Sequence, residues 1–205
     1  TKNLEKIDNN NIIGPSNDKL LNIDELSIPG EHNLQNFLAA STCSHLMGIS
    51  QNQIVKSMKE FKGVEHRLEY VRTINEADYI NDSKATNIDS VIVAINTYKQ
   101  PIVLILGGFN KGANFRLLLP HIKSSHVRDI VSYGDAGGQI NTALGDAVRS
   151  IQVTDLSSAV KKAQLMAAPG DIVLLSPGCA SYDEFSNFEE RGNHFKSIIK
   201  NFVTS

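Results

Sequence analysis

The 205-residue sequence predicts an α/β fold with a mostly parallel sheet and helices on both faces, and three observations lead to this prediction. After Gly63, strand-like and helix-like segments alternate, which is typical of parallel sheets with crossover helices. The runs 102–106 (IVLIL) and 172–175 (IVLL) are apolar without a break, as expected of central strands covered on both faces. Polar, glycine-containing turns follow these runs, and parallel sheets bind ligands at that edge.

The elements after Gly63 can be assigned from their periodicity. The expected strands are 68–74, 79–81, 102–106, 127–133, 151–153 and 172–175. The expected helices are 88–98, 115–122, 137–144 and 156–167, and then a last helix with Phe195, Ile198, Ile199 and Phe202 on one face. Because 68–74 alternates in polarity and precedes a tight turn at Asn75, we expect it to be an antiparallel hairpin partner.

The part before Gly63 follows a different pattern. Residues 1–30 are expected to be irregular, with polar loops around short apolar pieces and a break at Ile28-Pro29-Gly30. A helix from near Asn33 to Gly48 follows. A second helix is expected to begin with a capping box at residues 50–53. Its inward-facing residues are expected to be Ile54, Val55, Met58 and Phe61. We therefore divide the chain into residues 1–62 and 63–205.

Composition excludes several function classes. With 41% hydrophobic and 20% charged residues the chain is globular, and a net charge of −2 gives no electrostatic case for binding nucleic acid or an anionic membrane. No apolar run approaches the ~18 residues of a membrane span, and the first ten residues contain no apolar signal core. Cys43 and Cys179 fit no metal-binding spacing. These features predict a cytoplasmic protein without a nucleic-acid or membrane partner.

The most informative stretch is 79–87 (YINDSKATN), which lies where a strand runs into a helix. The free N–H groups and the dipole of a helix N-terminus favour anions. Asp82, Lys84 and two hydroxyls in that turn are more than a turn requires. The structural alternative is that Thr86 or Asn87 caps the helix while Asp82 and Lys84 are solvated.

Two further polar turns should share this edge of the sheet: 107–112 (GGFNKG) and 176–181 (SPGCAS). If the strands are parallel, all three turns face one crevice, with lysines supplying charge and hydroxyls and amides supplying donors. Such a crevice suits a small carboxylate or a phosphate. Taken alone, the first turn could be a tight turn with Lys111 as a surface charge, and the second a loop without a ligand.

A cationic pair, His66-Arg67, follows Gly63 at the expected junction between the two parts, where a solvated hinge is the alternative interpretation. The other histidines have no ligand-like spacing, and we assign no metal ligands in this chain.

Together these motifs resemble the Mur ligase superfamily, the ATP-dependent amide-bond ligases of peptidoglycan synthesis. The segment 29–40 (PGEHNLQNFLAA) is similar to the G-x-H-N-x-x-N helix of the family's central ATPase domain, and His66-Arg67 resembles the pair that opens its C-terminal domain. The motif at 81–87 (NDSKATN) resembles the form found in the branch that adds D-glutamate. The turns at 107–112 and 176–181 and the segment 183–192 (DEFSNFEERG) complete the match, whereas Glu65 and Tyr182 depart from the usual pattern.

The resemblance implies a Rossmann-like C-terminal domain over 63–205, preceded by the tail of the central ATP-binding domain over 1–62. The family's glycine-rich P-loop, its metal-binding glutamate and histidine, and its N-terminal nucleotide domain are not found in this sequence. We therefore expect a monomeric C-terminal fragment without ligase activity of its own.

The resemblance also implies ligands and roles. ATP and Mg²⁺ would be the cofactors, and D-glutamate, ATP and UDP-N-acetylmuramoyl-L-alanine the small-molecule partners, with an acyl phosphate as intermediate. The residues expected at the nucleotide are Asn33, Asn36, Arg67 and Asp82. Those expected at D-glutamate are Thr86, Lys111, Ser181, Tyr182 and Phe188. The catalytic candidates are Lys84, beside D-glutamate, and His66, which would position either the acyl phosphate or the phosphate chain.

Two other interpretations stay open. One is a non-catalytic α/β module that binds amino acids or nucleotides. The other is a different ligase of the superfamily, adding a diamino acid or extending folate with glutamyl units, against which the motif at 81–87 argues.

Overall fold

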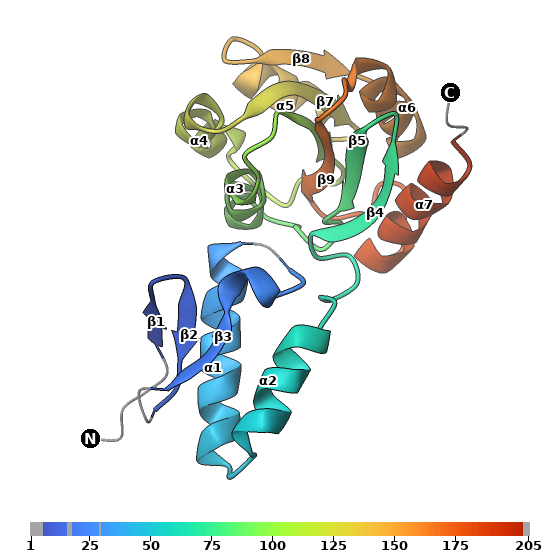
Figure 1. The fold of residues 1–205 in the computed structure, drawn as a ribbon. Helices are drawn as coiled ribbons and strands as arrows, with labels where there is room; N and C mark the ends of the chain where they lie inside the picture. The colour runs from blue at the N-terminus through green and yellow to red at the C-terminus, as the bar shows by residue number, and fades with distance from the viewer. Residues whose placement is uncertain (1–5, 16–17, 29, 203–205) are drawn as a thin grey trace. The chain divides into compact units, whose positions relative to one another are not determined.

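The computed structural model describes residues 6–15, 18–28 and 30–202, so the break expected at Pro29 lies outside the described residues (Figure 1). The chain divides into two compact units, one ending at Gly63 and the other beginning at Val64. Within the described residues, none of the helices combines the length and the apolar character needed to cross a membrane.

The first unit begins with an antiparallel sheet of β1 (Lys6–Asp8), β2 (Asn11–Ile13) and β3 (Lys19–Asn22). This sheet corrects the expectation that residues 1–30 are irregular. Asn9 and Asn10 form the two-residue turn between β1 and β2, both with positive φ, which asparagine tolerates better than most residues. β1 has no buried side chain and β2 and β3 have one each, so these strands carry too weak a period to be recognised in the sequence.

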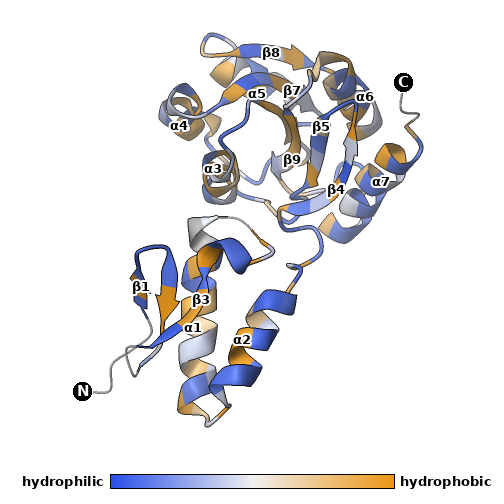
Figure 2. Cartoon of the chain, viewed as in Figure 1, coloured by the Kyte–Doolittle hydropathy of each residue, from blue (hydrophilic) through white to orange (hydrophobic). Residues whose placement is uncertain are grey.

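A short 3-10 helix, η1 (Ile23–Glu25), leads to two helices, α1 (Glu31–Leu46) and α2 (Gln51–Glu60). The core of the unit consists of Ile12, Leu21, Phe37, Ile54 and Met58. Figure 2 shows α2 with apolar and polar residues alternating along its length, as expected of a helix with one buried face. The predicted capping box is wrong: Ser50 makes no hydrogen bond to the helix backbone, and its hydroxyl lies 2.7 Å from Oε1 of Gln53 instead.

The second unit is built on a six-stranded sheet of order β4-β5-β9-β6-β7-β8. Its strands are β4 (Glu69–Ile74), β5 (Ala77–Asn81), β6 (Ile102–Gly107), β7 (Val127–Tyr133), β8 (Arg149–Gln152) and β9 (Ile172–Gly178). Only β4 is antiparallel to its neighbour, β5, with the predicted tight turn at Asn75 and Glu76 between them. The predicted fold class, a mostly parallel sheet with an antiparallel hairpin partner, is confirmed.

Two apolar clusters cover the two faces of this sheet. Along the central strands, alternate residues enter opposite clusters: Ile102 and Leu104 of β6 belong to one, Val103 and Ile105 to the other. The first cluster is completed by α3 (Ile88–Thr97), the 3-10 helix η2 (Phe115–Leu118), α4 (Leu119–Ser124) and α5 (Gly137–Leu144). The second is completed by α6 (Leu156–Met166) and α7 (Phe188–Lys200) (Figure 1). The continuous apolar runs therefore mark strands buried on both faces.

Candidate functional site

The three polar turns lie at the ends of neighbouring parallel strands, because β9 pairs with both β5 and β6. Their backbones are joined directly. The N–H of Asp82 donates to the carbonyl of Leu175 at 2.8 Å, and Phe109 and Ala180 exchange two hydrogen bonds of 2.9 and 3.1 Å. The side chains of the three turns are thus presented from one continuous edge of the sheet.

The close approach of the backbones requires glycine after β6. Gly107 and Gly108 have φ of 152° and 119°. A Cβ on Gly108 would lie 2.3 Å from the carbonyl oxygen of Ala180, and one on Gly107 would lie 2.3 Å from that of Tyr133. Both positions therefore exclude any side chain.

Asp82 is buried at the end of β5, with only 5% of its surface exposed, which rules out the alternative that it is solvated. Its Oδ2 accepts a hydrogen bond from Ser176 at 2.8 Å, and its Oδ1 accepts one from the N–H of Leu68 at 3.2 Å. Burial raises the pKa of Asp82 to about 7, although these two bonds and the charge of Arg67 act in the opposite direction. Near neutral pH the protonated and the ionised forms of this carboxyl are therefore both populated.

Lys84, Phe188 and His66 lie beside one another. Nζ of Lys84 is 4.8 Å from the centre of the Phe188 ring, a cation–π contact, and the His66 ring meets Phe188 edge to face with centroids 6.1 Å apart. The backbone N–H of Lys84 donates to the carbonyl of His66 at 3.0 Å. Three residues predicted for the site from distant segments are therefore brought together.

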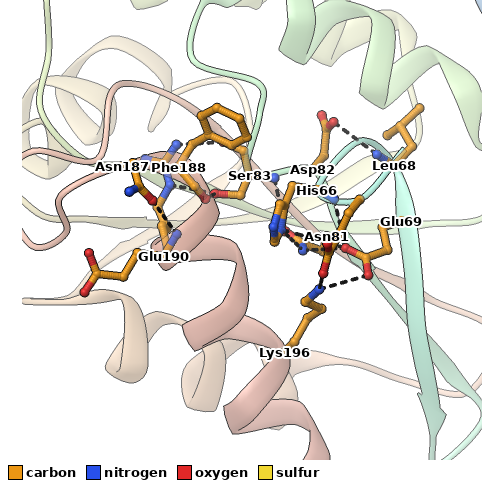
Figure 3. A network of polar contacts seen from close by, with 12 residues as sticks. His66, Leu68, Glu69, Asn81, Asp82, Ser83, Asn187, Phe188, Glu190 and Lys196 are labelled. Atoms are coloured by element: carbon orange, nitrogen blue, oxygen red, sulfur yellow. Dashed lines mark hydrogen bonds and ion pairs between the residues drawn. The ribbon is translucent and has the colours of Figure 1, made fainter. Parts of the chain in front are cut away.

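The surroundings of His66 form a network between β4, β5 and α7 (Figure 3). Its ring is 4% exposed and its Nδ1 lies 2.9 Å from Nδ2 of Asn81. The same amide nitrogen donates to Glu69, which also accepts from the backbone N–H of His66, both at 2.9 Å. Lys196 of α7 donates to Glu69 at 3.1 Å and to Glu65. The network holds His66 in a left-handed backbone conformation, φ 64°, that side chains rarely adopt.

Arg191 of α7 is fully buried and ties two of the turns together. Its guanidinium donates to the carbonyl and hydroxyl of Ser83 at 2.8 and 3.0 Å, and to the carbonyls of Cys179 and Ala180 at 3.1 Å each. No ion pair with a carboxylate is found for Arg191 among the described residues. Its guanidinium is therefore held by neutral oxygen acceptors, and Glu184 acts on its charge only from beyond ion-pair distance.

The turn after β6 is shaped by Asn110, whose Oδ1 accepts hydrogen bonds from the N–H groups of Gly112 and Ala113 at 2.9 and 2.7 Å. Lys111 is exposed at its tip. Ser181 is buried at 3% exposure, and Tyr182 beside it is 66% exposed.

The remaining predicted residues fall into two groups. Thr86 is half-buried and does not cap α3; the cap is Asn87, whose Oδ1 accepts from the N–H of Ser90 at 2.9 Å. Asn33 and Asn36 lie on α1 of the first unit, and the geometry of the second unit does not bear on their role.

Magnesium prefers a shell of several oxygen ligands. In the described part of the chain, no group of three His, Cys, Asp or Glu side chains lies close enough to hold a metal ion.

Sequence reasoning missed the residues beneath the turns: Glu69, Asn81, Ser83, Ser176, Arg191 and Lys196. For Arg191 a signal exists, because it lies four and eight residues before Phe195 and Ile199 on the buried stripe of α7. An arginine on an apolar stripe requires buried acceptors. Asn81, Ser83 and Ser176 lie in the predicted polar turns, but no role was assigned to them, and Glu69 and Lys196 look like ordinary surface residues until the strands are paired.

Comparison with known proteins supplies the family. A family model described as "Mur ligase, glutamate ligase domain" matches residues 66–179, more than half of the chain. The chain belongs to the Mur ligase family. The matched range contains the turns of β5 and β6 and all but the end of the turn after β9, so the resemblance to the Mur ligases is confirmed.

Among curated Mur ligases, the UDP-N-acetylmuramoylalanine–D-glutamate ligase of Pelotomaculum thermopropionicum is 47% identical over 178 residues, covering 86% of this chain and 39% of that protein. The ligase of the same name from Clostridioides difficile is 44% identical over 199 residues, covering 95% of this chain and 44% of that protein. The chain thus spans about two fifths of the length of these relatives.

Solved Mur ligase structures share the fold. The UDP-N-acetylmuramate-alanine ligase of Thermotoga maritima matches with a TM-score of 0.65 at 18% identity, covering 85% of this chain and 39% of that one. A pseudomurein peptide ligase type C from Methanothermus fervidus matches with a TM-score of 0.64 at 16% identity, covering 95% of this chain and 40% of that one.

Proposed function

We propose that this chain supplies the D-glutamate-binding part of a cytoplasmic, ATP-dependent ligase that joins D-glutamate to UDP-N-acetylmuramoyl-L-alanine in peptidoglycan synthesis. The observation that carries the proposal is the arrangement of Lys84 and Lys111, exposed on turns whose strands are separated only by β9. The names of the relatives at 44–47% identity support the same substrate.

The chemistry of the edge suits a small dianion. D-Glutamate presents two carboxylates, and lysines on two separate turns offer a point charge for each. The guanidinium of Arg191 binds the carbonyls of two of these turns, and its positive charge favours an anion at this edge. Ser181, Thr86 and Phe188 complete the proposed D-glutamate site, with Tyr182 at its exposed margin.

Contacts to ATP are proposed for the four remaining residues. Asp82 and Arg67 at the end of β5 would meet the ribose and phosphates of ATP, and Asn33 and Asn36 the adenine. In the proposed reaction a carboxylate of the muramoyl substrate is converted to an acyl phosphate, which the amine of D-glutamate then attacks. This chain's lysines would orient the amino acid and reduce the repulsion between two anions.

A chimera tests the proposal. Residues 30–205 of this chain replace the matching segment of the Clostridioides difficile ligase, and phosphate release is measured with ATP, Mg²⁺ and the muramoyl substrate. We expect release that depends on D-glutamate and does not occur with L-glutamate or a diamino acid. Release that depends on a diamino acid instead would assign the chain to another branch, and loss of release in a correctly folded chimera would favour the non-catalytic binding module.

A further inference from the structure

The hydrogen bond between Asn81 and His66 has a direction that its neighbours determine. The backbone N–H of Ser83 donates to Oδ1 of Asn81 at 3.1 Å, which identifies that atom as the oxygen. Nδ2 lies 2.9 Å from Oε2 of Glu69, and a carboxylate can only accept. Exchanging the two amide atoms would set oxygen against carboxylate and NH₂ against the N–H of Ser83. Two independent contacts, to Ser83 and to Glu69, therefore fix the orientation of the Asn81 amide.

The amide nitrogen of Asn81 carries two hydrogens. One is donated to Glu69, and the other points to Nδ1 of His66 at 2.9 Å. Nδ1 therefore accepts, which requires that it carries no proton. In a neutral imidazole the proton then lies on Nε2. A doubly protonated ring would bring N–H against N–H at this contact.

The groups packed around the ring keep it uncharged. Burial is the main factor that lowers the pKa of His66, and Lys196 of α7 lowers it further. Glu69 of β4, Glu65 in the preceding segment and Glu189 of α7 act in the opposite direction without reversing it. At pH 7 the ring is neutral, in agreement with the hydrogen-bond pattern.

Nothing within the described residues uses the remaining nitrogen. Nε2 of His66 makes no hydrogen bond to any described residue, although only 4% of the surface of His66 is exposed. The ring lies beside Phe188, which also carries the ammonium group of Lys84 on its face. A single N–H donor is thus left at the edge where the lysine charge attracts anions.

We propose that Asn81 and Glu69 are positioning residues that hold His66 as the neutral tautomer protonated at Nε2. His66 then has a donor for a carboxylate or phosphate oxygen and has no nitrogen left to act as a base. The tautomer follows from contacts within the second unit alone, whereas the use of the donor by a ligand rests on the proposed function.

The tautomer can be measured on the 205-residue chain labelled with ¹⁵N-histidine. Long-range ¹H–¹⁵N spectra distinguish a ring nitrogen that carries hydrogen from one that does not, and loss of one signal set in His66→Gln assigns the residue. We expect the hydrogen of His66 on Nε2 and a bare Nδ1 at pH 7. The exposed His194 is the internal control. Hydrogen on Nδ1, or on both nitrogens, would overturn the proposal.

Two variants test how the tautomer is held. In Asn81→Asp the new carboxylate accepts from Nδ1, so the hydrogen should move there and the pKa of His66 should rise. In Glu69→Gln an amide oxygen can still accept from Asn81, so the tautomer should be unchanged. A purely structural role for Asn81 would leave the hydrogen on Nε2 in both variants, and that result would refute the positioning role.

The chimera then separates this proposal from the proposed function. Because Nε2 of glutamine can donate but cannot act as a base, His66→Gln should retain about tenfold more kcat/KM than His66→Ala, a difference of about one hydrogen bond. Equal losses in both variants would contradict the donor role. An inactive chimera with hydrogen on Nε2 would refute the proposed function and leave the tautomer standing.

Discussion

The guanidinium of Arg191 lies 2.8 Å from the carbonyl oxygen of Ser83, and this contact joins the last helix to the turn that carries Lys84. The same side chain also holds the carbonyls of Cys179 and Ala180 in the turn after β9. The two turns are therefore spaced by a residue that is itself fully buried and lies outside the ligand edge.

Replacing Arg191 should destabilise the second unit strongly. Arg191→Ala removes four hydrogen bonds and leaves buried carbonyl groups without donors, so we expect the free energy of unfolding to fall by about 3–5 kcal/mol. Urea unfolding followed by circular dichroism measures this. Arg116→Ala, at an exposed position with no side-chain hydrogen bond in the described structure, is the control and should change stability by less than about 0.5 kcal/mol. Equal effects of the two substitutions would show that the buried contacts contribute nothing.

Gly192 should tolerate no side chain, in contrast to Gly138. A Cβ at Gly192 would lie 2.2 Å from Nδ1 of His66, so Gly192→Ala should push the ring away from Asn81 and cost about 1–3 kcal/mol. A Cβ at Gly138 in α5 would meet nothing closer than 3.8 Å, so Gly138→Ala should stabilise by about 0.5–1 kcal/mol. Thermal unfolding of the two variants gives the sign of each change. A stabilising effect of Gly192→Ala would mean that the ring does not pack on α7 as described.

These residues also show how far the sequence alone can predict the molecule. Long apolar runs and turn motifs predicted the parallel sheet and the edge at which Lys84, Lys111 and Ser181 stand. Periodicity is a local pattern, and the turns after parallel strands share one edge of the sheet. The partners of His66 and the acceptors of Arg191 could not be predicted, because they lie on different elements and meet only once β5, β9 and α7 have packed. Asn81 is 15 residues from His66, and Ser83 is 108 residues from Arg191. The small sheet of the first unit was missed because its three strands are three or four residues long.

Asp82 should make stability fall as the pH rises. Its pKa is about 7 in the folded chain against an ordinary value of 3.8, so between these values the folded state holds a proton that the unfolded state has lost. The contribution of Asp82 to the free energy of unfolding is therefore fully present near pH 4. It is lost as the pH rises toward 7, and the loss is at most about 4 kcal/mol. His66, with its pKa lowered, contributes a slope of opposite sign near pH 6.5, so the wild type alone does not isolate the effect.

Comparison with Asp82→Asn isolates it. Asparagine keeps an acceptor for the N–H of Leu68 and does not titrate. The free energy of unfolding of the variant, relative to that of the wild type, should therefore increase as the pH is raised from 5 to 8. Asp155→Asn is the control, because the pKa of Asp155 is already low and asparagine also caps α6. Urea unfolding at both pH values measures the difference. An unchanged pH dependence in Asp82→Asn would mean that Asp82 is ionised throughout this range.

Lys111 should determine the affinity for D-glutamate. A hydrogen bond to a charged group contributes about 1.5–3 kcal/mol, and ~1.4 kcal/mol corresponds to a tenfold change in affinity. In the chimera, Lys111→Ala should therefore raise the KM for D-glutamate by roughly ten- to a hundredfold and change the KM for ATP far less. Lys123→Ala, an exposed lysine on α4, removes the same charge away from the turns and is the control. Steady-state kinetics with each substrate varied in turn gives both constants. If Lys111→Ala weakened ATP and left D-glutamate unaffected, this edge of the sheet would belong to the nucleotide, and the amino acid would bind elsewhere.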